Sequence, residues 1–306
     1  MNKITVLTYL HENETQFDRC ISGLERQTYK DFDWVILSHK MPQEPIGIPH
    51  QVLLLPEGMH VRSDVMNWAF PQIKTKYIAY NDSDDSSLPN RLKLQLDFME
   101  NNPKVDISSG MFFVNETENT WPLHEKHDMI ASFLLINCPM VHPAIIIRNR
   151  IGHFGVKFKY NSNYVRAQDY DFWYQCIKSG LRFHNLQTQV ISYHVPPNKP
   201  SNDTQEQSAI EIRNQILHEA GIVIPITLYQ IYHDFCKLQH LDQVDLIKLL
   251  DFVKKHKFKK MFKNAKKAFA WQLDLYMKHH QLSNNSEFVK LKLLLEKESL
   301  IKRLFS

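Results

Sequence analysis

Three aspartates, Asp82, Asp84 and Asp85, occur within four consecutive residues, directly after the apolar run Tyr77–Tyr80. Carboxylates this close together repel one another, and the repulsion costs stability unless a cation or a set of hydrogen-bond donors offsets it. Aspartates also favour turns and helix caps, so a capping role is the structural alternative, although one carboxylate would suffice for it. Because acidic clusters with perturbed charges mark functional sites, the pattern favours a metal or nucleotide site.

The chemistry that fits such a cluster is displacement at the anomeric carbon of a sugar, with a nucleoside diphosphate as the leaving group. A hard divalent cation such as Mg²⁺ or Mn²⁺, held by carboxylate oxygens, neutralises the charge that develops on the phosphates. An acceptor hydroxyl is a poor nucleophile until a carboxylate or a histidine takes its proton. This reaction therefore requires a second acidic site elsewhere in the chain.

The first hundred residues alternate short apolar runs with amphipathic stretches. The apolar runs predict strands at Ile4–Thr8, Trp34–Leu37, Val52–Leu55 and Tyr77–Tyr80. Apolar residues at helical spacing predict three helices. The first carries Phe17, Cys20, Ile21 and Leu24, the second lies around Asp64 to Phe70, and the third follows Pro89 and carries Leu92, Leu96 and Met99. The alternation predicts an α/β fold, a mainly parallel sheet with helices on both faces. Ligands of such sheets bind beyond the carboxyl ends of the strands, where the acidic cluster is placed.

The second hundred residues give a mixed pattern. A helix-like stretch precedes Cys138, a strand is predicted at Ala144–Ile147, and a helix is predicted from Asp169 to its C-terminal stop at Gly180. The polar segment from Pro196 to Ser208 contains three prolines, which is typical of a mobile loop or linker.

A domain change is predicted near residue 220, because all eight glycines lie at or before Gly221 and the remainder is helical in pattern. We expect residues 1–220 to form the catalytic domain, divided into a nucleotide-sugar part (1–102) and an acceptor-side part (103–220). Residues 221–306 are expected to form a helical, basic C-terminal region.

Four stretches, Cys20–Tyr29, Tyr77–Asp85, His142–Arg148 and Ala167–Trp173, resemble in order and spacing the motifs of family 2 glycosyltransferases. These are inverting enzymes with the GT-A fold, a Rossmann-like α/β fold, and the resemblance covers roughly residues 1 to 205. It implies that Asp82 faces the nucleotide ribose, that Asp84 binds the metal, and that Asp169 is the catalytic base.

Further site residues are expected on this basis. The nucleotide-sugar is expected to contact Thr8, Tyr9, Ser38, Asn67, Asp82 and Ser83. Asn67 has a helix-capping role as its alternative. On the acceptor side the candidates are His142, Arg148, Gln168 and Trp173. His142 could instead be a core or loop residue, and Trp173 is favoured as a core residue over a sugar platform.

The chain departs from the family pattern at three places. Gln168 stands before the base, where the family usually has a glutamate. After the second strand the family usually has an acidic pair that touches the base of the donor, whereas this chain has Ser38-His39-Lys40. A UDP-sugar is favoured as donor, but recognition of its base is left open. Where the family often has a histidine as a metal ligand this chain has Pro196, so either His194 or water would complete the metal shell.

The composition, with 43% hydrophobic and 23% charged residues, is that of an ordinary globular protein. Four widely spaced cysteines without a CxxC pair favour buried free thiols in a reducing compartment. There is no apolar run of about 18 residues, and the opening segment is too short for a signal peptide. The expected location is the cytoplasm.

Charge is unevenly distributed. From Leu246 to Ser306 fifteen Lys or Arg face five Asp or Glu, so this tail carries +10 and the remainder −6. Apolar residues recur at helical spacing from Phe258 to Tyr276 between many lysines, which predicts an amphipathic basic helix over Lys257 to Lys278. One interpretation is that this helix packs on the catalytic domain or on a second subunit, and the second case would make the protein an oligomer. The other is that residues 251–280 adsorb to an anionic membrane. Adsorption would place the enzyme on the inner face of the cell membrane, near a lipid-linked or other glycan acceptor.

Two other classes of protein fit the sequence less well. A nucleic-acid or polyanion-binding protein would explain the basic tail but not the acidic cluster, so no nucleic-acid partner is expected. A nucleotidyltransferase would also use paired aspartates and a metal, but it should have a glycine-rich phosphate loop near the first strand. Thr8-Tyr9-Leu10-His11 contains no glycine. A glycosyltransferase of surface polysaccharide or glycoconjugate synthesis remains the favoured interpretation.

Overall fold

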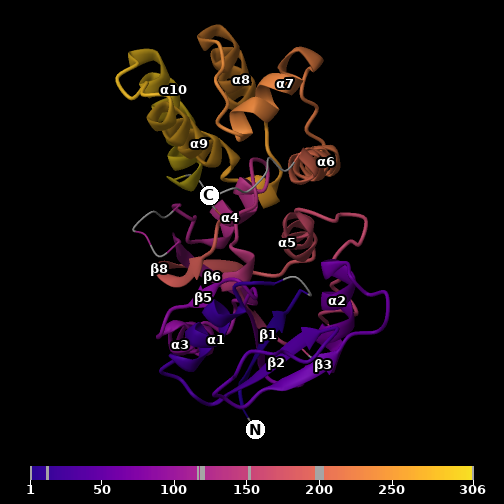
Figure 1. The fold of residues 1–306 in the computed structure, drawn as a ribbon. Helices are drawn as coiled ribbons and strands as arrows, with labels where there is room; N and C mark the ends of the chain where they lie inside the picture. Colours follow the sequence, from indigo (N-terminus) through magenta and orange to yellow (C-terminus); the bar gives the residue numbers. More distant parts are fainter. Residues whose placement is uncertain are drawn as a thin grey trace. The chain divides into compact units, whose positions relative to one another are not determined.

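The computed structural model describes residues 2–11, 14–115, 117, 121–150, 153–196 and 203–304, with side chains described up to residue 296 (Figure 1). The chain forms two compact units. The first comprises Met1–Lys126 and Met140–Gln205, and the second comprises His127–Pro139 and Glu206–Ser306. The expected division at residue 220 therefore differs from the observed one, because most of α6 (Asp203–Ala220) and the segment at 127–139 belong to the second unit.

The first unit is built on a mixed, mostly parallel sheet of eight strands in the order β3-β2-β1-β4-β7-β6-β8-β5. The strands are β1 (Ile4–Tyr9), β2 (Phe32–Ser38), β3 (Gln51–Leu54), β4 (Tyr77–Tyr80), β5 (Ser86–Ser87), β6 (Ile107–Val114), β7 (Ile146–Arg148) and β8 (Phe183–Tyr193). The first four pair in parallel, β7 runs antiparallel to both β4 and β6, and β8 runs parallel to β6. The predicted α/β fold and its four N-terminal strands are confirmed.

The central strands are fully buried, which explains their continuous apolar runs. All six residues of β1 and all four of β4 are buried. Helices α1 (Phe17–Glu25) and α3 (Arg91–Asn101) share one hydrophobic cluster with these strands. That cluster holds the apolar positions from which both helices were predicted, namely Phe17, Cys20, Ile21, Leu24, Leu92, Leu96 and Met99.

The topology places a ligand site beside the end of β1. Strand β1 lies between β2 and β4. The chain places β2 and β3 on one side of β1 and then crosses over to place β4 on its other side. Such a switch point opens a crevice at the carboxyl ends of the strands. Asp82 follows β4 by two residues and therefore stands at this crevice, as the sequence predicts.

The second unit is helical. Its helices are α4 (His127–Phe133), the larger part of α6, α7 (Ile226–Cys236), α8 (Gln243–Lys255), the 3-10 turn η3 (Lys260–Phe262), α9 (Ala265–His279) and α10 (Ser286–Leu304). The loop predicted from Pro196 to Ser208 is helical from Asp203 onward, whereas residues 197–202 lie outside the described part of the chain. None of the described helices is long and apolar enough to cross a bilayer.

The continuous helix predicted over Lys257 to Lys278 is wrong. Helix α8 ends at Lys255, and His256 is extended. Helix α9 begins only at Ala265, after the backbone N–H of Asn264 donates to Ser132 Oγ of α4 at 3.2 Å. This tertiary contact and the burial of Phe262 between the two helices override a helical period that continues in the sequence.

The apolar stripe of α9 is already covered within its own unit. Ala265, Phe269, Leu273 and Tyr276 are at most 3% exposed. The ring of Phe269 stacks on that of Phe235 in α7, at 6.0 Å between centroids. The packing interpretation of this segment therefore accounts for its apolar face, while Lys257, Lys259, Lys260, Lys263 and Lys278 are exposed.

Candidate active site

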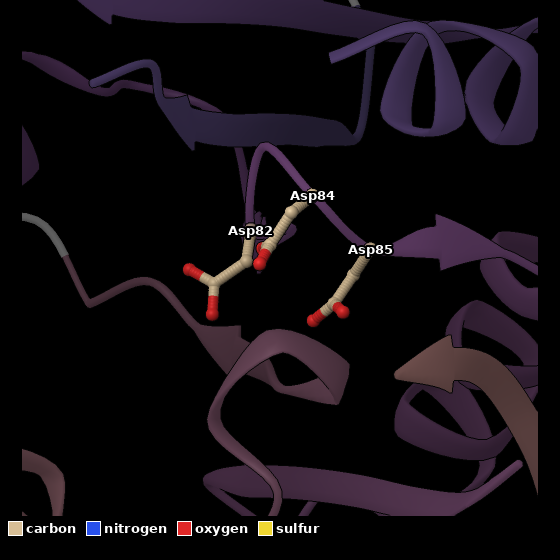
Figure 2. A group of neighbouring side chains, drawn as sticks. All are labelled: Asp82, Asp84 and Asp85. Atoms are coloured by element: carbon tan, nitrogen blue, oxygen red, sulfur yellow. The ribbon is translucent and has the colours of Figure 1, made fainter. Parts of the chain in front are cut away.

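The acidic loop, Asp82–Asp85, connects β4 to β5, and its three aspartate side chains leave the loop on the same side (Figure 2). One carboxylate oxygen from each of the three lies within 4.8 Å of the others. The loop does not cap α3, because β5 and the next three residues intervene and the N-cap residue of that helix is Asn90. The capping alternative is therefore wrong.

Asn81 holds the acidic loop in shape. Its side-chain Nδ2 donates to the backbone oxygens of Asp82 and Asp85, at 2.7 and 3.0 Å. Its Oδ1 accepts from Ser87 Oγ at 2.6 Å and from Arg91 Nη1 at 2.9 Å. Burial lowers the pKa of Arg91 to about 10, and the carboxylate of Asp85 is its main opposing influence. A buried polar network thus fixes the direction of the aspartates before any ligand binds.

The three carboxylates have different surroundings. Asp82 pairs with Arg62, with 2.8 Å between Oδ1 and Nη1. Burial raises the pKa of Asp84, and the charges of Asp82 and Glu14 raise it further. Burial raises the pKa of Asp85 well above its usual range, and Asp82 and Asp84 add to the effect. Burial and mutual repulsion thus disfavour the charged form of the last two aspartates, and a bound cation would favour it.

The side chain of Asp85 is only half paired. Its Oδ1 accepts from the backbone N–H of His194 at 2.6 Å, while the buried Oδ2 has no hydrogen-bond partner among the described residues. A buried oxygen without a partner in a cluster of three carboxylates is one that a bound cation would satisfy, and an all-oxygen donor set is the one that Mg²⁺ and Mn²⁺ prefer. These residues therefore fit the divalent cation that the sequence implied. Within the described chain the candidate ligand group consists of the three aspartates, and His194 contributes to it only a backbone N–H that donates to Asp85.

Asp169 lies in the first turn of α5 (Gln168–Lys178), directly after Ala167, which adopts a left-handed conformation with φ 54°. Its charge acts on a set of side chains that also face the acidic loop. The pKa of Tyr193 is raised by burial first, then by Asp82, Asp85 and Asp84, and also by Asp169. The charges of the predicted base and of the acidic loop therefore act on the same tyrosine.

His142 is a second group that both carboxylate sites influence. Its Nε2 is 2.8 Å from the hydroxyl of Tyr160, and its ring lies 4.4 Å from that of Tyr80. Burial lowers the pKa of His142, while Asp82 and Asp169 oppose this. His142 is therefore a buried imidazole packed against Tyr80 and Tyr160, as its core alternative describes, and its acceptor-side role stays a prediction.

The expected donor contacts separate into two groups. Ser38 and Tyr9 lie at the carboxyl ends of β2 and β1, and Ser83 donates to Glu14 Oε2 at 3.1 Å, so these three stand at the crevice. The hydroxyl of Thr8, in contrast, is completely buried and accepts from Trp34 Nε1 at 3.1 Å. The side chain of Thr8 is therefore part of the core.

Asn67 neither caps a helix nor points a free amide at the crevice. It lies in the second half of α2 (Arg62–Ala69) and clamps the backbone of Tyr160. Its Nδ2 donates to the carbonyl oxygen of Tyr160 at 2.9 Å, and its Oδ1 accepts from the N–H of the same residue at 2.8 Å. This pair ties α2 to the segment that leads into α5.

The remaining acceptor-side candidates are placed differently from one another. Gln168 is the half-buried first residue of α5, beside Asp169. Trp173 is fully buried, so the core interpretation is confirmed. Arg148 pairs with Tyr77 in the register of β7 and β4, at the end of β4 opposite to the acidic loop. Its guanidinium donates to the carbonyl oxygens of Val105, Met99 and Asn102 and to the Tyr77 hydroxyl, which makes it a structural brace.

Sequence reasoning missed Arg62. This residue is the first of α2, where the helix dipole disfavours a cation. A cation at the start of a predicted helix was the sequence signal that could have indicated a partner for Arg62. That partner is Asp82, twenty residues further along the chain. His11 was missed as well. Its pKa is lowered by partial desolvation and by the charge of Arg62, and raised by that of Asp82.

The raised pKa values predict how metal binding depends on pH. In the folded protein Asp84 and Asp85 keep their protons to a higher pH than in an unfolded chain, and a cation must displace those protons. We expect the Mn²⁺-induced rise in melting temperature to grow between about pH 4 and pH 7. Over the same range the metal-free protein should lose stability, because deprotonation leaves uncompensated buried charge. Thermal unfolding with and without Mn²⁺ across this range measures both effects, and an Mn²⁺ shift that is constant with pH would contradict the assignment.

Comparison with known proteins gives consistent findings. A model of the family described as "Glycosyl transferase family 2" matches residues 51–171. "Uncharacterized glycosyltransferase MJ1057" of Methanocaldococcus jannaschii is 30% identical over 207 residues, which cover 63% of this chain and 70% of that protein. "O-antigen biosynthesis glycosyltransferase WbnJ" of Escherichia coli is 26% identical over 257 residues, 78% of this chain and 96% of that protein.

Solved structures resemble the fold. The S. aureus TarS fragment 1–349 in complex with UDP-GlcNAc superposes with a TM-score of 0.58 at 13% identity, over 97% of this chain and 91% of that one. The chain spans 55% of the longer TarS structure. At this identity the likeness concerns the fold alone, and it extends over both the α/β unit and the C-terminal helices.

Proposed function

Because the chain belongs to glycosyl transferase family 2, we propose that it transfers a sugar from a nucleoside diphosphate donor to an acceptor hydroxyl, with inversion at the anomeric carbon. The observation that carries the proposal is the acidic loop at the switch point of the sheet. Its three carboxylates approach within 4.8 Å of one another, and one buried oxygen of Asp85 is left without a partner. Neither a cap nor a structural ion pair explains that arrangement.

The donor half of the reaction takes place at the acidic loop. Asp84 and Asp85, together with Asp82, would hold Mg²⁺ or Mn²⁺, which supplies positive charge to the departing diphosphate. Asp82 faces the ribose in this proposal, and its pairing with Arg62 keeps its carboxylate oriented. Asn81 keeps the loop from relaxing when the ligand leaves.

The acceptor half of the reaction is assigned to Asp169. Its carboxylate takes the proton of the acceptor hydroxyl as the oxygen attacks the anomeric carbon. The bond from that carbon to the phosphate oxygen breaks in the same step, and the nucleoside diphosphate leaves with the electron pair. One displacement inverts the configuration. The buried ring of His142, held by Tyr160, is influenced by the charges of both Asp82 and Asp169.

For the donor we propose a UDP-sugar. The acidic pair that would read uracil is replaced by Ser38-His39-Lys40. In this proposal His39, whose Nε2 lies 3.1 Å from the carbonyl oxygen of Met59, contacts the base through its other ring nitrogen. Support comes from the shared fold with TarS, whose fragment was solved with UDP-GlcNAc. A thermal-shift screen of UDP-, GDP- and ADP-sugars with and without Mn²⁺ tests this. UDP-sugars should stabilise the protein, and more so with Mn²⁺; stabilisation by a GDP- or ADP-sugar alone would reassign the donor.

For the acceptor we propose a glycan or a lipid-linked sugar of surface polysaccharide or glycoconjugate synthesis. The name of WbnJ, an O-antigen biosynthesis enzyme that this chain matches over 96% of its length, supports this class. A nucleotidyltransferase is disfavoured because Thr8-Tyr9-Leu10-His11 at the end of β1 contains no glycine. A nucleic-acid-binding role would leave the acidic loop without a purpose.

We also propose that the basic surface at residues 251–280 meets an anionic membrane by charge alone, since the apolar stripe of α9 is buried. Lys257, Lys259 and Lys260 are exposed there. Binding to acidic vesicles should fall as salt rises, because exposed charges are screened over about 10 Å at 0.1 M ionic strength. K257E/K260E should release the protein from such vesicles, whereas K30E/K104E, with the same change of net charge in the first unit, should not. Equal binding by both double variants would remove the membrane proposal.

A further inference from the structure

The first unit contains a recess of about 690 Å³ between α2, the loop after β3 and the segment at 155–162. None of the three aspartates of the acidic loop lines it, and neither does Arg62. We propose that this recess binds neutral sugar units of the acceptor glycan, away from the hydroxyl that reacts. The inference rests on the proposed function and names a subsite of its acceptor.

One face of α2 forms the floor of the recess. Asp64, Asn67 and Trp68 are spaced i, i+3 and i+4, so they lie on the same side of the helix. Arg62 is about 200° around the axis from Asp64 at 3.6 residues per turn, which directs it to the acidic loop. The helix therefore serves the donor site with one face and the recess with another.

The opposite wall is held rigidly against α2. Gly155 has φ +74°, and a Cβ at this position would meet Pro71 Cδ at 2.5 Å and the carbonyl oxygen of Asn67 at 2.8 Å. The amide of Asn67 clamps the backbone of Tyr160, and Ser162 Oγ donates to Asp64 Oδ1. These three contacts hold the walls of the recess in place before a ligand binds. Binding therefore costs less conformational entropy of the protein.

The chemistry of the recess matches a carbohydrate. Trp68 is half-buried, and no aromatic ring of the described chain stacks on its indole, so the indole offers an apolar surface to the C–H face of a sugar. Asp64 and Glu57 offer carboxylate oxygens to sugar hydroxyls, and Lys159 offers a donor. Its volume lies within the range of about 300 to 1,000 Å³ that is typical of ligand pockets.

The charge of the recess favours a neutral ligand over a free diphosphate. Glu57 and Asp64 carry two negative charges against the one positive charge of Lys159. A diphosphate would be repelled by this balance, whereas a neutral sugar would not. The wall of the recess also packs on α5, because the ring of Tyr160 stacks on that of Phe172 with 3.9 Å between centroids. Tyr160 thus joins the wall of the recess to the helix that carries Asp169.

The test is isothermal titration of the full chain with neutral hexasaccharides built from glucose, mannose and N-acetylglucosamine. We expect at least one of the three to bind, and W68A and D64N each to weaken that binding at least tenfold. D64N keeps the shape of its side chain, so it reports on the recess even if W68A unfolds. W121A is the matched control, because Trp121 is 67% exposed and does not line the recess; it should bind as the unmodified chain does.

A second readout separates this inference from the proposed function. D84N should still bind the hexasaccharide, and D64N should still be stabilised by UDP with Mn²⁺. If none of the hexasaccharides binds, or if W68A and D64N both bind as tightly as W121A, the recess is not a sugar site, whatever the outcome for the donor. If D64N loses hexasaccharide binding while no nucleotide stabilises the unmodified chain, the recess stands and the donor assignment fails.

Discussion

Replacing Asp84 with asparagine should abolish sugar transfer while leaving the fold intact. The change is isosteric, but it removes a carboxylate whose pKa is already raised by burial and by Asp82 and Glu14, and with it a ligand of the cation. Removing a preorganised charge-stabilising group typically costs about 10² to 10³ in rate, and we expect at least the upper end here, because loss of the cation removes more than one hydrogen bond. The value of kcat/KM, measured beside the melting temperature, reports both effects.

The matched control for this variant is D31N. Asp31 is an exposed aspartate just before β2, so the same chemical change there should leave transfer unaltered. In the metal-free state D84N should be at least as stable as the unmodified chain, since it relieves repulsion within the acidic loop. Turnover that is unchanged in a folded D84N protein would exclude the assigned role of Asp84.

Replacing Asp169 with asparagine should have the second-largest effect, and a different signature. A general base acts in the transition state and contributes little to donor binding in the ground state. We expect kcat to fall by about 10² to 10⁴. The affinity for UDP in the presence of Mn²⁺ should stay as in the unmodified chain. Single-turnover transfer at saturating donor, together with a separate measurement of UDP affinity, distinguishes the two effects.

The control for Asp169 is D18N. Asp18 also lies in the first turn of a helix, α1, and is exposed, so its loss tests the general effect of removing an acidic residue from a helix start. D18N should transfer normally. A D169N protein that loses UDP binding but keeps its turnover at saturation would move Asp169 from the acceptor to the donor side.

The α/β half of the fold was predictable because its strands and helices follow simple periods. Strands β1 and β4 are fully buried and read as continuous apolar runs. Strands β6 and β8 were missed, and β6 shows why. Its buried positions include Ser108, Ser109 and Gly110, and a Cβ on that glycine would lie 2.7 Å from Val190 of β8. Close approach of two strands selected small polar residues, which erase the hydrophobic pattern.

The C-terminal helices show the opposite failure. The period from Phe258 to Tyr276 continues without interruption in the sequence, yet the chain turns at His256 and starts a new helix at Ala265. What decides the break is a contact with α4, more than one hundred residues away, through Asn264 and Ser132. A local pattern carries no information about such a partner.

For the site, sequence spacing identified the carboxylates but not their partners. Asp85 was recognised as part of the cluster, while its unpaired buried oxygen, which makes it a metal-ligand candidate, is visible only in three dimensions. Thr8 and Arg148 were expected to act at the site. The side chain of Thr8 packs in the core, and Arg148 lies at the opposite end of β4. A position next to a strand end does not determine which way its side chain points.

The central claim is that the acidic loop binds a divalent cation together with the donor nucleotide. Titration of the protein with Mn²⁺ in the presence of UDP, followed by the electron paramagnetic resonance signal of the free ion, measures this directly. The unmodified chain and D31N should each remove one equivalent of Mn²⁺ from solution, and D84N should remove none. If D84N removes as much Mn²⁺ as the unmodified chain, the cation is held elsewhere and the account of this site is contradicted.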